Sequence, residues 1–129
     1  MRRTRRRDER GASAVEMVFF LPILFTVVLI AVQFAMVYLG NQAASAIARE
    51  TARVARATAD EGKARLAGER YADNMSTGIL NGHRITITPL GSDRVRVTVT
   101  GEAQKISPIG VPQVSQTVEG PIEQFVGND

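Results

Sequence analysis

The chain begins with a charged stretch, continues with a long apolar run and ends in shorter alternating segments. From Met17 to Leu39 there are 23 residues without a formal charge. Their only polar side chains are Thr26, Gln33 and Tyr38. At about 1.5 Å per residue, a helix of this length reaches about 35 Å, enough to cross a hydrocarbon layer of about 30 Å with some tilt. The pattern therefore predicts a membrane-spanning helix.

Pro22 lies early in this run. It removes one backbone hydrogen bond and clashes with the preceding turn, so we expect a helix kink at this position.

The helical pattern continues beyond the apolar run, from Gly40 to Thr58. Ala43, Ile47, Val54 and Thr58, with Thr51 between them, recur at three- and four-residue steps and predict a narrow apolar stripe. Three arginines form another stripe, which we interpret as a solvated face: Arg49, Arg53 and Arg56. Glu50 offers Arg53 a partner three residues away. Contact of this stripe with lipid headgroups or a protein partner is the alternative.

A second helix is predicted from Glu61 to Met75, because Asp60, Glu61 and Gly62 interrupt the first pattern. Its inward side is expected to hold Ala64, Ala67 or Gly68, Tyr71 and Met75. Asn81-Gly82 is a turn signal. The single histidine, His83, is expected to be an exposed turn residue, since no second metal-binding side chain lies at a useful spacing.

Two alternating runs then predict an antiparallel hairpin, Arg84–Thr88 and Arg94–Thr100. Gln113–Gly120 is a possible third strand, after the Pro- and Gly-rich stretch ISPIGVP. Because so few strands need a cover on their apolar side, we expect the outer part of the long helix to lie against them. The predicted fold class is α+β, with a long N-terminal transmembrane helix packed on a small antiparallel sheet.

Charge is concentrated at the N-terminus. Residues 1–11 contain six arginines, one Asp and one Glu, a net charge of +4, whereas the whole chain carries +3. The positive-inside rule therefore places the N-terminus in the cytoplasm and the C-terminal part across the membrane. The folded part lacks the basic excess of a specific nucleic-acid-binding domain, although an arginine arm can contact nucleic acid or anionic lipid without specificity.

The sequence offers little for catalysis. There is no Cys and only one His. No catalytic triad order, nucleophile elbow, phosphate-binding glycine loop or metal-ligand spacing is found. We therefore expect no enzymatic activity, no metal, no cofactor and no small-molecule substrate.

Glu16 stands at the start of the apolar run, five residues after Gly11. A carboxylate inside lipid costs a few kcal/mol unless it is paired. A simple membrane anchor does not explain this residue or Gly11. A secretory signal peptide with a small-residue cleavage site at Ala43–Ala46 is a second alternative, but a signal's apolar core has only about 7–15 residues.

Gly11, Ala12, Ser13, Ala14, Val15 and Glu16, followed by the apolar helix, resemble the processing site of type IV prepilins. The longer string RGASAVEMVFFLPILFTVVLIAVQFAMVYLGNQAASAIARETARVAR resembles the TadE-like branch, the minor pilins or pseudopilins of tight-adherence pilus systems. The matching features are Leu21-Pro22, Gln33-Phe34, Tyr38 and AIARETARVAR. Thr51 and Met17 depart from the usual Gly and Phe.

The resemblance implies cleavage between Gly11 and Ala12 by a prepilin peptidase. It further implies that Glu16 guides subunit assembly, and that other pilins and the membrane-bound assembly machinery are partners. The new α-amine of Ala12 is a natural partner for the Glu16 carboxylate.

We thus expect four regions: a cytoplasmic leader (1–11), a transmembrane helix (12–39), an extracytoplasmic helical region (40–80) and a small antiparallel β region with an irregular C-terminal tail (81–129). A permanently anchored binding or sensor module and a secreted domain released at Ala46 remain the alternatives.

Overall fold

The computed structural model describes residues 9–75, 79–106, 108 and 112–122, with side chains from Ser13 onward. Most of the predicted leader and the end of the predicted C-terminal tail lie outside these residues. The elements in chain order are α1 (Glu9–Thr58), α2 (Glu61–Met75), β1 (Leu80–Leu90), β2 (Arg94–Ala103) and β3 (Gln113–Pro121). This arrangement confirms the predicted α+β fold, including the third strand.

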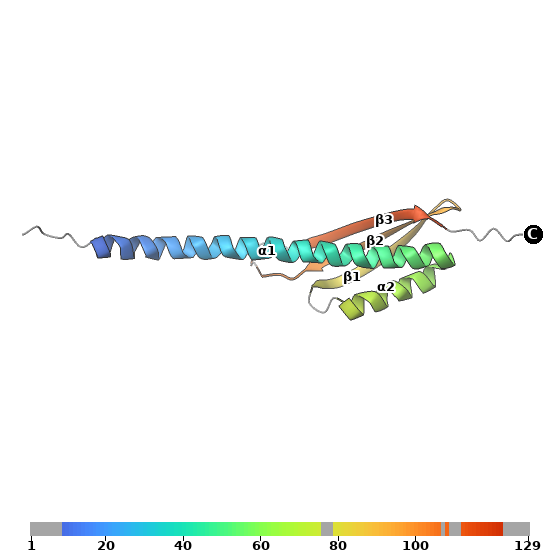
Figure 1. The fold of residues 1–129 in the computed structure, drawn as a ribbon, viewed down its shortest axis with the longest axis horizontal. Coiled ribbons are helices and arrows are strands. Elements are labelled where there is room, and N and C mark those ends of the chain that lie inside the picture. The colour runs from blue at the N-terminus through green and yellow to red at the C-terminus, as the bar shows by residue number, and fades with distance from the viewer. Residues whose placement is uncertain (1–8, 76–78, 107, 109–111, 123–129) are drawn as a thin grey trace, which may run out of the picture.

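One long helix organises the molecule. The sheet and α2 lie along the C-terminal half of α1, and the N-terminal half extends beyond them as a single helix (Figure 1). The three strands form an antiparallel sheet in the order β1-β2-β3. α1 contacts mainly β2 and β3, while α2 lies against α1 and β1.

The core lies between α1 and one face of the sheet. The strands contribute β-branched residues that alternate with exposed ones, as predicted for a half-buried sheet. Ile85, Ile87, Val95, Val97 and Val99 are all buried. The outer part of α1 is therefore the cover that the sheet requires.

The buried face of α1 is wider than the predicted stripe and consists mostly of alanine. Val54 is only half-buried and Thr58 is exposed, contrary to the prediction. The reason is that α1 contacts both the sheet and α2, so two adjoining strips of its surface are covered. The buried residues are Gly40, Ala43, Ala44, Ile47, Ala48, Thr51, Ala52 and Ala55.

The contact between the two helices is close enough to require glycine. A Cβ placed on Gly68 of α2 would overlap with the Thr51 hydroxyl and lie 2.8 Å from Ile85 Cδ1. The inward face of α2 is Ala64, Gly68 and Ala72, with Met75 partly buried. Tyr71, predicted to face inward, is 38% exposed, because the helices approach too closely for a large side chain.

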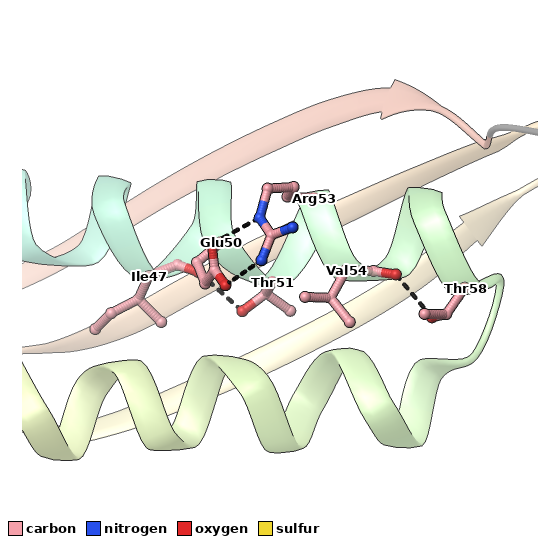
Figure 2. A network of polar contacts seen from close by, with 6 residues as sticks. All are labelled: Ile47, Glu50, Thr51, Arg53, Val54 and Thr58. Atoms are coloured by element: carbon pink, nitrogen blue, oxygen red, sulfur yellow. Dashed lines mark hydrogen bonds and ion pairs between the residues drawn. The ribbon is translucent and has the colours of Figure 1, made fainter.

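Short polar contacts stabilise the outer half of α1 (Figure 2). Thr51 is fully buried, and its hydroxyl donates a hydrogen bond of 2.8 Å to the Ile47 carbonyl. Burial of this hydroxyl therefore leaves no donor unpaired. On the solvent side, the Arg53 guanidinium donates two hydrogen bonds to the Glu50 carboxylate, at 3.0 and 2.7 Å, which confirms the predicted pair.

α1 ends in a tight connection to α2. Ala59 adopts a left-handed backbone conformation, with φ of 52°, and its amide donates to the Ala55 carbonyl at 2.9 Å. Asp60 then caps α2, since its Oδ1 accepts a hydrogen bond of 3.1 Å from the Lys63 amide. The break predicted at Asp60 is thus confirmed.

Two expectations near the start of β1 were wrong. Asn81-Gly82 is no chain reversal but an irregularity within β1, where the pairing register with β2 shifts between Asn81 and Arg84. Gly82 has a φ of 57°, a left-handed conformation that favours glycine. Here this conformation occurs in a β-bulge rather than in a turn. His83 lies in this strand, half-buried, and its Nε2 is 2.7 Å from Glu69 Oε2 of α2.

Candidate functional site

Most of the N-terminal half of α1 is an exposed apolar surface, and hydrogen bonds from the rest of the described chain reach it only at Gln33. Phe19 and Phe34 are each 71% exposed, and Val18 is 66% exposed. A surface this large and apolar is unfavourable in water and marks a site of contact with lipid or protein. The other exposed large apolar residues of this half are Val15, Met17, Phe20, Leu21, Ile23, Leu24, Phe25, Val27, Val28, Ile30, Tyr38 and Leu39.

Among the described residues, α1 is the one helix long and apolar enough to cross a membrane, judged by length and composition. It meets these criteria within Ser13–Thr58, and its most apolar stretch is unburied. The apolar half of α1 therefore fits a membrane anchor, as the sequence predicts.

Glu16 is the acidic residue on this surface. It shares one side of α1 with Ser13, Met17 and Phe20, at helical spacings of three and four residues. Its side chain is exposed. The carboxylate is thus free to meet a group from outside the chain or from the N-terminal end of the same helix.

Gly11 and Ala12 lie in the first turns of α1, which begins at Glu9. The proposed cleavage point is therefore helical in this structure. The assigned roles of both residues in processing remain predictions.

Pro22 lies inside α1, and the helix assignment continues on both sides of it. The Thr26 hydroxyl donates a hydrogen bond of 2.8 Å to the Pro22 carbonyl, four residues earlier. This is the i−4 bond typical of a helical threonine, and it does not replace the bond that Pro22 cannot donate to the Val18 carbonyl. The kink expected at Pro22 remains a prediction.

Gln33 has a role that the sequence did not reveal. Its Oε1 accepts a hydrogen bond of 2.9 Å from the Ile106 amide, and its Nε2 donates one of 3.2 Å to the Gln104 carbonyl. Both partners belong to the connection between β2 and β3. A polar residue in an apolar run was the available signal, but its partner more than 70 residues away was not predictable by local pattern.

Other titratable groups form structural pairs rather than a cluster. Arg94 and Arg96 of β2 pair with Glu119 of β3 across neighbouring strands. The Arg53 guanidinium holds the pKa of the Glu50 carboxyl below its ordinary value, through a hydrogen bond and its charge. Within the described residues, no three His, Cys, Asp or Glu side chains are placed to hold a metal ion.

Residues 11–53 match the family model described as TadE-like protein. The match covers Gly11, Glu16, the apolar half of α1 and most of its alanine-rich half, and it confirms the resemblance seen in the sequence. No curated protein and no solved structure matches the chain.

Proposed function

We propose that the chain is a minor pilin or pseudopilin of a tight-adherence pilus, because residues 11–53 match the model of TadE-like proteins. In this proposal the chain is made as a membrane-anchored precursor, cut after Gly11 by a prepilin peptidase, and passed to the pilus. Other pilin subunits and the assembly machinery are its partners.

The observation that carries the proposal is the division of α1 into two halves. The outer half is buried by a small α+β domain, whereas the inner half exposes a continuous apolar surface with one carboxylate near its start. Such a helix is suited to two successive environments, the bilayer and a bundle of like helices. Both environments bury the apolar side chains, so transfer between them does not expose this surface to water.

Cleavage would supply a positively charged partner for the Glu16 carboxylate. Removal of residues 1–11 deletes the net charge of +4 that fixes the N-terminus in the cytoplasm. It also creates an α-amine on Ala12, about one helical turn from Glu16. Pairing of the two groups, within one chain or between neighbours, reduces the cost of holding the carboxylate in a medium of low dielectric constant.

Gly11 fits the demands of cleavage. Because it lies within the first turns of α1, a peptidase that cuts an extended chain must first unwind this end. Glycine lowers the cost of unwinding, since it is a poor helix former and permits close approach of the enzyme to the backbone.

N-terminal sequencing of the protein isolated from cells tests the proposal. We expect Ala12 as the first residue. An intact Met1 would instead indicate a permanently anchored protein, and Ile47 would indicate a secreted domain released after Ala46. Gly11→Leu should abolish processing and leave the protein in the membrane fraction, which shows that insertion is intact.

A permanently anchored binding module is the second candidate, and one observation favours it. The sheet face that points away from α1 carries exposed arginine and threonine side chains on neighbouring strands, including Thr86, Arg96 and Thr117. That face is a possible recognition surface. Retention of the leader on the mature protein would support this candidate.

A further inference from the structure

The connection that follows β2 extends along α1 toward its apolar half. Its base is closed by a hydrogen bond of 2.9 Å from the Ala103 amide to the Pro112 carbonyl. Close contact begins at Gly40, where an added Cβ would lie 3.1 Å from Ala103 Cβ. From there the chain reaches Gln33, about two turns further toward the N-terminus, through the contacts of Gln104 and Ile106.

These contacts locate the outer limit of the membrane on α1. The backbone of residues 104–106 is not part of a helix or a sheet. Irregular backbone exposed to lipid is not tolerated in the hydrocarbon layer, because its polar groups lose their water partners there. The hydrocarbon layer must therefore end before Gln33, although the apolar run continues to Leu39.

The remaining length of helix agrees with this limit. Ser13 to Val32 comprises about 20 residues, which is the number required to cross a hydrocarbon layer of about 30 Å. With this placement, Glu16 lies about one turn inside the cytoplasmic boundary rather than at its edge.

Aromatic side chains occur where this placement puts the outer boundary. Phe34 and Tyr38 are one turn apart and are 71% and 63% exposed. The Tyr38 hydroxyl accepts a hydrogen bond of 3.0 Å from Gln42 Nε2, on the side away from the apolar half. An apolar ring with a polar tip directed outward is typical of a membrane–water interface.

We propose that residues 104–106 form a foot that rests on the outer surface of the bilayer at the level of the lipid headgroups. Ile106 is 39% exposed and contacts the outer ends of the acyl chains. Lys105, also exposed, reaches the lipid phosphates. The foot fixes the depth of α1 and the height of the α+β domain above the membrane. This inference depends on the membrane anchoring in the proposed function.

The absence of cysteine from the chain permits a direct test. Single cysteines are introduced by Val27→Cys within the span, Ile106→Cys in the foot and Ser92→Cys in the β1–β2 turn, at the far end of the sheet. Each full-length variant carries an environment-sensitive fluorophore and is inserted into vesicles of phosphatidylethanolamine and phosphatidylglycerol. Quenching is compared between lipids with a nitroxide on the headgroup and lipids with a nitroxide at the middle of the acyl chain.

We expect the label at position 106 to be quenched most strongly from the headgroup, the label at 27 from the acyl chain, and the label at 92 by neither. A label at 106 that behaves like the one at 92, while the one at 27 is quenched from the acyl chain, overturns the foot and leaves anchoring intact. Deep quenching at 106 also overturns it. Loss of quenching at 27 contradicts the anchoring itself.

A second variant tests the role of Gln33. Gln33→Leu removes both hydrogen bonds to the connection, so headgroup quenching at position 106 should fall toward the value at 92. Gln42→Leu makes the same chemical change on α1 at a residue that bonds Tyr38 instead, and should leave quenching at 106 unchanged. Equal quenching in the two variants would show that Gln33 does not hold the foot in place.

Discussion

At the residue scale, the proposed function depends on Glu16, a carboxylate in an apolar segment where lipid disfavours a charge. Glu16 is exposed on an apolar helix surface, beside Met17 and Phe20. A charge at this depth costs several kcal/mol unless a partner offsets it. In the proposed function, cleavage after Gly11 would provide that partner as a free amine.

Glu16→Ala should leave cleavage largely intact but reduce incorporation into the filament. A loss of about tenfold corresponds to about 1.4 kcal/mol, a modest value for one desolvated charge pair. The measurement is the amount of subunit in purified filaments relative to the processed subunit in the membrane. Glu102→Ala removes an exposed acid from the sheet and serves as control. Wild-type incorporation of the Glu16 variant would refute the pairing role.

Gly68 is the residue that permits the close contact of α1 and α2. Gly68→Ala forces a Cβ against the Thr51 hydroxyl and Ile85 Cδ1, and overpacking of this kind costs about 1–3 kcal/mol. The free energy of unfolding of the full chain, measured by denaturant titration in detergent micelles, should fall by this amount.

Gly62→Ala is the matched control on the same helix. Gly62 is exposed, and its added Cβ would lie 3.3 Å from Asp60 Oδ1, the oxygen that caps α2, so the exposed Asp60 side chain must shift slightly. Alanine is the better helix former by up to about 1 kcal/mol, so this variant should be at least as stable as the wild type. An equal loss in both variants would show that the destabilisation does not depend on the contact with Thr51.

At the element scale, the two halves of α1 meet different demands with one continuous helix. The outer half carries small alanine, glycine and threonine residues, which allow both the sheet and α2 to pack closely against it. The inner half carries large apolar side chains and receives no cover from the described domain. The change occurs between Gln33, which contacts the connection after β2, and Gly40, which lies against the end of the sheet.

The Glu50–Arg53 pair on the outer half predicts a pH dependence. Because the folded-state pKa of Glu50 is lowered, its contribution to stability is present above the ordinary pKa of glutamate. The contribution is lost as the pH falls through the lowered value. Arg53→Ala should raise the pKa of Glu50, which is measured by following its carboxyl carbon in an NMR titration. An unchanged pKa would show that the ion pair does not form in solution.

At the scale of the whole molecule, the orientation follows from charge. The leader carries the basic excess, so the α+β domain should lie on the side of the membrane opposite the leader. In cells whose outer surface is accessible, a membrane-impermeant thiol reagent should modify Ser92→Cys but not Thr4→Cys in the uncleaved Gly11→Leu background. Modification of Thr4→Cys alone would reverse the proposed topology.

Local physics was enough to predict several elements from the sequence. The apolar run from Met17 to Leu39 is too long for anything but a buried or membrane helix, and the alternating Val and Ile residues after Arg84 and Arg94 have the period of a strand. The start of α2 followed from the break at Asp60. The candidate site also lies in one local segment, so Gly11 and Glu16 were predicted from their spacing and the family resemblance alone, and their roles remain predictions.

The surfaces through which the helices and strands pack against one another could not be predicted from the sequence pattern. The buried face of α1 was wider than the predicted stripe because two elements cover it. Tyr71 is exposed, contrary to the prediction, because the close contact of the two helices at Gly68 leaves no room for a large side chain between them. The prediction that His83 is an exposed turn residue was wrong, because its partner Glu69 belongs to α2, outside the local sequence. The role of Gln33 was not predicted because its hydrogen-bond partners lie in residues 104–106, far away in the sequence. The periodicity of apolar residues predicts local secondary structure. Contacts between residues distant in the sequence depend instead on how the helices and strands pack together.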